Sequence, residues 1–431
     1  MSAGASSDVL SRREAGSPSF TRLFTGGVVG FSQKVLDLFR YVTHRSWMLL
    51  RFRARQIQHR WLFRGRLHRI LVVRIASIGD VARATAVVAR LRNAYPEATI
   101  DFLTSPAALA VIRGHSAVQT VYTLSDLDHL GQYDWVINLQ TPDPPDSFLL
   151  PTHRTYHEVL TQLSTQVSPR LHSGRRLVSE REVISTNILC CRSEMEELFL
   201  IALQNYNPER YPETAVHPDP KSRAAVSRRW PLPQERPVAG VFLGSNSVGR
   251  GADEGFRTYS IDYLERLILH LAARFTVVVI GQSHIRTADE MAQYRAFLAR
   301  HHDIVDLVDK TSLDELVAVI AGFSLLVSSD SSPVHIALAT GVPVVGLYVA
   351  DATFRMSPRL SQEGFVAINS RAPCFYFSWR WRFFCEGCRD SRTRARYCEL
   401  PPLAFGVDRI PIAEIDRAIG TLLPTVQPPF A

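Results

Sequence analysis

The first half of the globular region combines two hydrophobic patterns. Short apolar runs at 70–73 and 98–104 are rich in β-branched residues, as buried strands are. Between them, apolar residues recur every three or four positions from Val81 to Leu91, and the helix that they predict ends before Pro96. Strand, helix and strand in this order predict a βαβ unit and therefore a parallel sheet.

The second half repeats this pattern. Apolar strands alternate with amphipathic helices, and both kinds of segment have the lengths typical of a parallel α/β domain. The predicted strands lie at 236–247, 276–282 and 324–330, and the predicted helices lie at 260–275 and 312–323. Five prolines between Pro218 and Pro237 predict a linker between the halves. The fold class is therefore α/β, with two doubly wound, Rossmann-like domains that face a cleft.

A chain of 431 residues is long enough for two domains. We place a basic, partly disordered helical extension before them and a short tail after them. The predicted parts are the extension at 1–66, a first Rossmann-like domain at 67–225, a second Rossmann-like domain at 226–402, and the tail at 403–431.

The helix of the first βαβ unit follows the loop "RIASIGD", in which Gly79 permits a tight turn and the close approach of a ligand. Asp80, at the end of this loop, has two interpretations. It is a good N-cap for the helix. Alternatively, it is a carboxylate beyond the carboxyl end of a strand, where ligands bind in open α/β sheets and where it would act as a general base.

Asp330 and the segment "SSPVHIALATG" that follows it also open a helix. Pro333 suits its first turn, and Ser331 or Ser332 suits its cap. The unpaired N–H groups of a helix N-terminus attract phosphate. His335 either faces the same space or packs as an ordinary helical histidine. This segment is a capped helix or a phosphate site.

Basic charge is concentrated at the N-terminus. Residues 1–69 contain 13 of the 49 basic and 3 of the 41 acidic residues, a net charge of +10, and the rest of the chain has a net charge of −2. A near-neutral body argues against a nucleic-acid-binding core. Between 20 and 69, arginines alternate with large apolar residues, which is typical of a helix on an anionic membrane surface. The alternative is a solvated helix packed on the body by its apolar side.

Other features narrow the class of protein. No run approaches the about 18 apolar residues of a transmembrane helix, and the N-terminus lacks the pattern of a secretory signal. Six cysteines in this length favour a reducing cytosol. We therefore expect a cytoplasmic protein, peripheral on the inner face of the cytoplasmic membrane.

Four of the cysteines lie close together in one segment rich in arginine and aromatic residues. They are Cys374, Cys385, Cys388 and Cys398, with one CxxC pair. Four thiolates suit zinc, but the single CxxC pair departs from the usual ribbon spacing. We expect reduced thiols in a surface loop and keep a structural metal as the alternative, with no catalytic metal.

Together, these motifs resemble glycosyltransferase family 9, the ADP-heptose:lipopolysaccharide heptosyltransferases and their relatives. "RIASIGD" is similar to the family's Arg-x-Ser-Ser-x-Gly-Asp motif. Asp330 with the following "SSPVHIALATGVPVVGLY" is similar to its Asp-Ser/Thr-Gly-Pro-x-His motif, about 250 residues further on. "YDWVINLQ" and the cysteine-containing loop also resemble family segments. The resemblance covers about 67–402.

The resemblance implies a GT-B fold, with the acceptor on the N-terminal domain (67–225) and the nucleotide-sugar donor on the C-terminal domain (226–402). It also implies inverting, metal-independent transfer of a sugar, with heptose as the first candidate and an ADP-sugar as the expected donor, to a lipopolysaccharide-type or other glycan acceptor. No cofactor is expected. Asp80 matches the catalytic base, and Ser77 and Gly79 match the loop beside it. The donor-binding residues by this match are Asp330, Ser331, Ser332, His335, Arg257, Gly244 and Ser245. Replacing Asp80 with alanine is expected to abolish transfer and to leave the fold nearly intact.

The chain departs from the family pattern at several positions. Ser332 replaces a glycine, Ala76 replaces a serine, and Arg257 stands where the family has a phosphate-contacting lysine. Arginine keeps the charge of lysine but changes the geometry. Asp289 and Glu290 are the candidates for reading the nucleoside. These departures keep open an alternative function, a non-catalytic nucleotide- or sugar-binding protein. A nucleotide-dependent oxidoreductase is disfavoured because the first loop lacks G-x-G-x-x-G.

Overall fold

The computed structural model describes residues 39, 42–43, 46–47, 49–50, 52–61, 67–139, 194–205, 214–231, 235–244, 258–348, 364–370 and 407–423. The described residues from Phe52 onward belong to one compact unit, and those before it belong to another. None of the described helices has both the length and the apolarity needed to span a bilayer.

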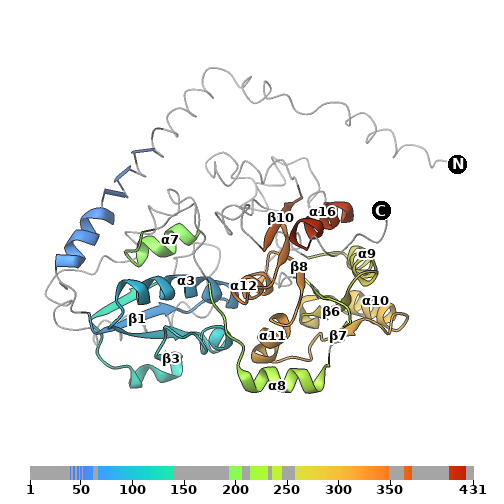
Figure 1. Ribbon diagram of the computed structural model, residues 1–431, viewed down its shortest axis with the longest axis horizontal. Helices are drawn as coiled ribbons and strands as arrows, with labels where there is room; N and C mark the ends of the chain where they lie inside the picture. Colours follow the sequence, from blue (N-terminus) through green and yellow to red (C-terminus); the bar gives the residue numbers. More distant parts are fainter. Residues whose placement is uncertain are drawn as a thin grey trace. The chain divides into compact units, whose positions relative to one another are not determined.

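The N-terminal sheet has four parallel strands in the order β3-β2-β1-β4 (Figure 1). Its strands are β1 Arg69–Arg74, β2 Thr99–Thr104, β3 Thr120–Tyr122 and β4 Trp135–Asn138. The long helix α3, Ile78–Ala94, connects β1 to β2, and the short 3-10 helices η2 and η3 cover Pro106–Val111 and Leu124–His129. The strands of the predicted βαβ unit are thus present and parallel, and each is largely buried because its residues are apolar.

The second sheet has six parallel strands in the order β10-β9-β8-β5-β6-β7. Its strands are β5 Val238–Phe242, β6 Thr276–Ile280, β7 Val305–Asp306, β8 Leu325–Ser329, β9 Val344–Tyr348 and β10 Phe365–Asn369. Its helices are α9 Ile261–Ala272, α10 Ala288–Leu298, α11 Leu313–Ile320, α12 Ser332–Ala339 and α16 Ile412–Leu422, with the short helices η5 Ser283–Ile285 and η9 Val407–Arg409. The prediction of two parallel, doubly wound α/β domains is confirmed.

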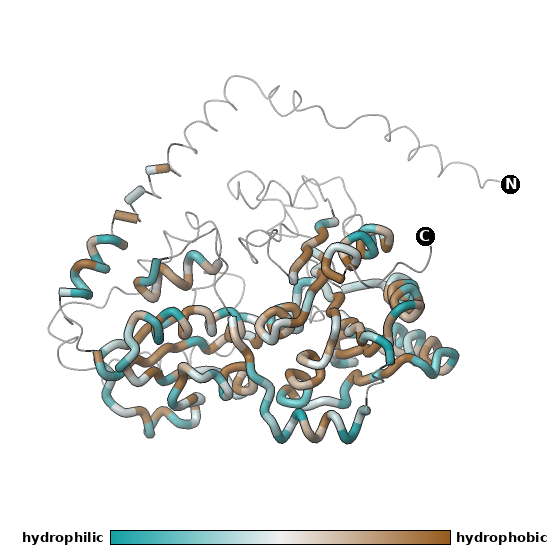
Figure 2. Tube along the Cα trace, viewed as in Figure 1, coloured by the Kyte–Doolittle hydropathy of each residue, from teal (hydrophilic) through white to brown (hydrophobic). Residues whose placement is uncertain are grey.

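Two further helices lie between the sheets in sequence, α7 Glu194–Ile201 and α8 Pro220–Arg229. Helix α8 occupies the segment predicted as a linker, and the predicted boundary at 225/226 falls inside it. Pro220, one of the prolines that predicted a linker, instead occupies the first turn of this helix. Asp219 caps the helix by accepting a hydrogen bond from the Ser222 N–H. Figure 2 shows a mostly hydrophilic α8, in which Val226 is the one buried residue.

One apolar core is shared by the two sheets, and each sheet has a further core of its own. One cluster of buried side chains includes Ile70 and Val87 from the first sheet and its helix, and Val334 and Ile336 from α12 of the second. Helices α3 and α12 contact each other directly (Figure 1). Packing between these two helices therefore brings together the ends of the sheets from which they start.

A lead-in helix of residues 52–61 precedes β1. Its buried residues Phe52, Gln56 and His59 recur at helical spacing on one face. The His59 ring lies 4.1 Å from the Trp135 ring, centroid to centroid, and the Gln56 amide donates to the Leu203 carbonyl. Burial lowers the pKa of His59 to about 4. This part of the extension packs on the body through a neutral histidine.

Candidate active site

The order of the strands identifies one switch point in each sheet. The chain runs outward from β1 through β2 to β3 and then returns to place β4 on the other side of β1. In the second sheet it runs outward from β5 to β7 and returns to place β8 beside β5. Ligands in open α/β sheets bind beyond the carboxyl ends of the strands at such points. Asp80, Gly244 and Asp330 come shortly after the ends of β1, β5 and β8, so all three lie at a switch point.

Asp80 belongs to the first turn of α3. The helix begins at Ile78 with Ser77 as its N-cap, so the interpretation of Asp80 as the N-cap was wrong by three positions. The N-cap hydroxyl does not cap the backbone; Ser77 Oγ instead donates to Asp80 Oδ2 over 2.6 Å. The carboxylate is thus held by a neighbouring hydroxyl at the start of the helix.

Two buried arginines also contact this carboxylate. Nη2 of Arg74, the last residue of β1, lies 3.3 Å from Asp80 Oδ1, and Arg83, one turn along α3, donates to the same oxygen. The side chains of Arg74 and Arg83 are 6% and 7% exposed, against 25% for Asp80. Burial alone would raise the pKa of Asp80, but the two guanidinium groups and the Ser77 hydroxyl hold it far below its usual range. Asp80 is an anion at any working pH.

The candidate phosphate site lies at the N-terminus of α12. Ser331 is the N-cap and Pro333 lies in the first turn, as predicted. The Ser331 hydroxyl does not point to open space, because it donates to the Ser329 carbonyl over 2.8 Å and lies 2.9 Å from Ser328 Oγ. Asp330 is buried, and its N–H continues the sheet by donating to the Leu347 carbonyl. The backbone N–H groups of α12 are therefore the donors that this turn offers to an anion.

Ser332 and His335 meet the loop that holds Asp80. The Gly79 N–H donates to Ser332 Oγ over 3.3 Å, although 253 positions separate the two residues. The His335 ring packs so closely that a methyl group at position 79 would lie 2.7 Å from its Cδ2 atom. The structure thus joins the two candidate loops, and the serine that replaces the family's glycine accepts the hydrogen bond between them.

The end of β5 has a buried cation of its own. Arg286 is fully buried and donates to the carbonyl oxygens of Leu243 and Tyr259 and to Glu290. Gly244 has a φ of +149°, which glycine adopts without strain, and a methyl group at this position would lie 3.2 Å from Arg286 Nη2. Glu290, a candidate for reading the nucleoside, accepts from Arg286 and caps α10 together with Thr287. The Glu290 carboxylate already accepts hydrogen bonds from Arg286 and from the start of α10.

Several predicted site residues lie outside the described residues. They are Ser245, Arg257 and the four cysteines Cys374, Cys385, Cys388 and Cys398. Within the part of the chain that the structure describes, no three His, Cys, Asp or Glu side chains are grouped to hold a metal ion.

Arg74, Arg83 and Arg286 were not among the predicted site residues. The signal for Arg83 is present in the sequence, since it is the one charged residue between Val81 and Val88 in a helix segment whose other side chains are small or apolar. A cation at such a position requires a buried anion as its partner. Arg286 has one partner at helical spacing in the sequence, Glu290, but its two backbone carbonyl partners are not identified by any sequence pattern.

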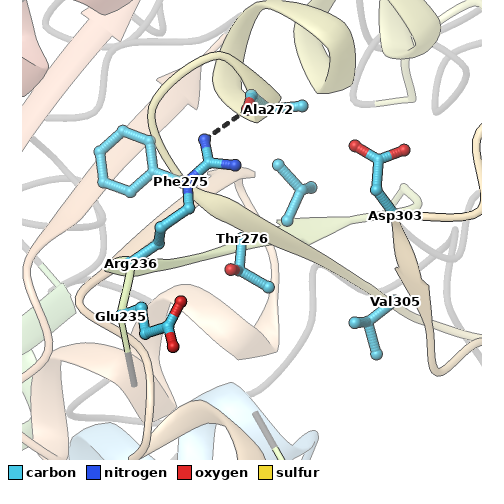
Figure 3. A pocket seen from close by; sticks show the side chains of 8 residues that line it. Glu235, Arg236, Ala272, Phe275, Thr276, Asp303 and Val305 are labelled. Carbon is cyan, nitrogen blue, oxygen red and sulfur yellow. Dashed lines mark hydrogen bonds between the residues drawn. The ribbon is translucent and has the colours of Figure 1, made fainter. Parts of the chain in front are cut away.

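A pocket of about 310 Å³ lies elsewhere, among Glu235, Arg236, Thr276 and Asp303 (Figure 3). These residues stand at the amino ends of β5, β6 and β7, at the edge of the sheet opposite to Gly244 and Asp330. Arg236 donates to the Ala272 carbonyl over 2.7 Å, and a dashed line marks this hydrogen bond in Figure 3. Because open α/β sheets bind ligands at the carboxyl edge, this pocket is no part of the candidate active site.

Comparison with known proteins agrees with this arrangement. The sequence model of glycosyltransferase family 9 (heptosyltransferase) matches residues 198–377, which include the α12 turn. Lipopolysaccharide core heptosyltransferase OpsX of Haemophilus influenzae is 21% identical over 307 residues, which span 69% of this chain and 84% of that protein.

Two solved structures show the same architecture. The glycosyl transferase family 9 protein from Veillonella parvula superposes with a TM-score of 0.58 at 15% identity, over 83% of this chain and 97% of that one. ADP-heptose lps heptosyltransferase II of E. coli does so with a TM-score of 0.50 at 18% identity, over 70% of this chain and 90% of that one. A segment that includes α12 is therefore similar to glycosyltransferase family 9 (heptosyltransferase), and the two solved structures share the two-domain fold of this chain.

Proposed function

We propose that the chain is an inverting, metal-independent enzyme that transfers a sugar, with heptose as the first candidate, from an ADP-sugar to a lipopolysaccharide-type or other glycan acceptor. The observation that carries the proposal is the hydrogen bond from Gly79 to Ser332. It sets the carboxylate of Asp80 beside a helix N-terminus suited to a diphosphate. Sugar transfer needs these two groups on opposite sides of one reacting carbon.

The proposed step is a single displacement. The acceptor oxygen forms a bond to C1 of the sugar as its proton passes to the Asp80 carboxylate. The bond from C1 to the phosphate oxygen breaks, and its electron pair leaves on the diphosphate. The N–H groups at the start of α12 stabilise this charge, a role that a metal ion has in other enzymes. Attack from the face opposite to the leaving group inverts the anomeric centre.

A screen of nucleotide sugars tests this function. ADP-heptose should raise the melting temperature more than UDP- or GDP-sugars, because the proposed donor should bind more tightly. A ligand at 100 times its Kd stabilises the folded protein by about 2.7 kcal/mol. A transfer assay with the ligand so found should persist in EDTA, and NMR of the product should show the inverted anomer. Retention of configuration, or strict dependence on Mg²⁺ or Mn²⁺, would contradict the proposed mechanism.

A non-catalytic binding protein is the second candidate, and one observation favours it. Asp80 is held by Arg74, Arg83 and Ser77, which makes its carboxylate a poor proton acceptor in this arrangement. Such a protein would be stabilised by the nucleotide sugar and would neither transfer nor hydrolyse it. Turnover in the same assay separates the two functions.

We also propose that the enzyme works at the inner face of the cytoplasmic membrane and binds it through residues 20–69. The described residues contain eight exposed large hydrophobic side chains, and seven of them lie in this segment: Phe39, Val42, Trp47, Leu49, Leu50, Ile57 and Trp61. Arginines alternate with them in the sequence. Exposed tryptophan beside arginine suits the interface of an anionic bilayer, where a lipid-linked acceptor would lie.

Replacement of Trp47 and Trp61 by serine should weaken binding to vesicles of phosphatidylglycerol and phosphatidylethanolamine by at least about 10-fold, because burying one large apolar side chain is worth about 1.5–3 kcal/mol. Cosedimentation measures the effect. The matched control is Leu269→Ser, which removes the one such exposed side chain outside this segment in the described residues. Equal loss in both variants, or equal binding to neutral phosphatidylcholine vesicles, would exclude a specific membrane surface.

A further inference from the structure

One buried arginine joins three segments of the chain at the carboxyl end of β5. The side chain of Arg286 is 0% exposed. It donates to the carbonyl oxygens of Leu243 and Tyr259 and to the carboxylate of Glu290, at the start of α10. Replacing a buried ion pair by well-packed apolar side chains is often neutral or even stabilising. Stability alone therefore does not explain why a guanidinium lies here.

The shape of the guanidinium group explains this position. Its N–H groups lie in one plane and point in fixed directions, so one side chain can hold two carbonyls and a carboxylate at once. Leu243 is the first residue beyond β5 and is fully buried. A buried carbonyl needs a hydrogen-bond donor, and Arg286 supplies it. This bond fixes the orientation of the peptide group that joins Leu243 to Gly244.

The orientation of this peptide group determines where the Gly244 N–H points. In a trans peptide the C=O and N–H bonds point in opposite directions, so the Gly244 N–H points away from Arg286. Gly244 is buried, and no acceptor for its N–H lies among the residues that the structure describes. Buried backbone N–H groups are nearly always paired. A donor of this kind at the carboxyl edge of an α/β sheet is suited to an anionic ligand.

The same peptide group lies on the edge of the sheet from which α12 starts. Strands β5 and β8 are parallel neighbours, with Val241 opposite Val327. Leu243 and Ser329 each come two residues after this pair, so both segments leave the sheet at one edge. Helix α12 begins three residues after Ser329. The Gly244 N–H and the N–H groups of α12 therefore belong to the same edge.

We infer that Arg286 is a positioning residue for the donor: it turns the peptide after β5 so that the Gly244 N–H donates to an oxygen of the donor's diphosphate. The inference rests on the proposed function for the identity of this anion. Arg286 acts through Gly244, because its own side chain is buried and its bonds go to protein groups. The fit is close, since a methyl group on Gly244 would lie 3.0 Å from Thr258 Cγ2.

Binding of inorganic pyrophosphate and of ADP tests the inference without any turnover. Arg286→Gln should weaken both by about 10-fold, because apparent affinity falls with the fraction of molecules that keep the binding arrangement, and losing hydrogen bonds from a charged group lowers that fraction. Pyrophosphate makes the test independent of the base of the donor. Arg286→Lys keeps the charge but not the planar fork, so it should recover only part of the affinity. Isothermal titration calorimetry measures these affinities.

The matched control is Arg274→Gln in the same domain. The Arg274 side chain is 6% exposed and forms an ion pair with Asp416. It lies just before β6, at the opposite edge of the sheet from Gly244. Its loss should lower the melting temperature, as the loss of Arg286 does, and leave both affinities unchanged. Equal weakening in the two variants, or unchanged affinity in Arg286→Gln, would overturn the inference.

Gly244→Ala gives a second readout, which a general loss of stability would not produce. Its methyl group would press on the Arg286 guanidinium, and a φ of +149° is strained for alanine. If both substitutions act by turning the same peptide group, the double variant should bind pyrophosphate about as weakly as the weaker single variant. Additive losses would show that Arg286 and Gly244 act independently, contrary to the inference.

Kinetics separates the inference from the proposed function. In Arg286→Gln the KM for the donor should rise while kcat at saturating donor stays near the wild-type value, because the lost contact is made in both the ground state and the transition state. A fall in kcat at unchanged KM would contradict the assigned role. A wild type that binds both probes and transfers no sugar would defeat the proposed function alone, whereas a wild type that binds neither probe would defeat both.

Discussion

Replacement of Asp80 by asparagine is expected to lower kcat for sugar transfer by about 10²–10⁴-fold, the range that a lost general base accounts for. Donor affinity should change little, because the diphosphate contacts the start of α12 and not this carboxylate. Single-turnover transfer and nucleotide titration measure the two quantities separately. Near-normal turnover in Asp80→Asn would show that another group takes the proton.

The same substitution should also lower stability, which differs from the expectation that the fold stays nearly intact. Without Asp80, the buried guanidinium groups of Arg74 and Arg83 lose the carboxylate that they share. Breaking a buried ion pair from one side costs about 3–5 kcal/mol, and the lower end applies here because a quarter of the Asp80 side chain is exposed. Chemical denaturation at neutral pH should show this loss.

The stability difference should depend on pH in a definite direction. The folded-state pKa of Asp80 is depressed, so its stabilisation is complete above the unfolded pKa of about 3.9 and is lost as the pH falls from there toward the folded value. Wild type and Asp80→Asn should therefore converge in stability only in strong acid. A constant difference down to such pH would contradict the ion-pair account.

Replacement of Gly79 by alanine is expected to reduce transfer on the order of 10²-fold, the effect of moving reacting groups by about 1 Å. The added methyl group would lie 2.7 Å from the His335 ring and 3.4 Å from Ser332 Cα, so the His335 ring or the two helices α3 and α12 must shift at the site. Overpacking of this kind costs about 1–3 kcal/mol. Steady-state kinetics and thermal unfolding measure both effects.

Gly420→Ala is the control for this variant. Gly420 also lies in a helix, α16, and an added methyl group there has no neighbour within 4 Å. Alanine should stabilise that helix by about 0.5–1 kcal/mol and leave transfer unchanged. If Gly79→Ala behaved in the same way, close contact between the two loops would not be needed for the reaction.

Much of the fold could be predicted from the sequence, because hydrophobic periodicity is a local property. The alternating strands and helices, the Ser331 cap and Pro333 in the first turn of α12 all depend on residues a few positions apart. The predicted N-cap of α3 lies three residues too late. Asp80 has the side chain of a good N-cap, but Ser77 takes that position and Asp80 binds the arginines instead.

Local patterns predict the candidate site only as two separate loops, and the predicted cleft and the family resemblance set these loops opposite each other. Each loop has a sequence signal, and the sequence presents Ser332 only as a departure from the family's glycine. In the structure, Ser332 accepts the Gly79 N–H, and this role depends on a residue 253 positions away. No local pattern specifies such a pair.

By itself, the sequence determined the two parallel α/β domains, the capped helices that open at the candidate loops, and a basic, tryptophan-containing extension. The tertiary structure alone decided that α3 packs on α12, that Gly79 meets Ser332 and His335, and that Arg74 and Arg83 share Asp80. The physical reason is that strand and helix signals arise from neighbouring residues. A buried charge or a close backbone contact is specified by whichever distant side chain the packed core brings against it.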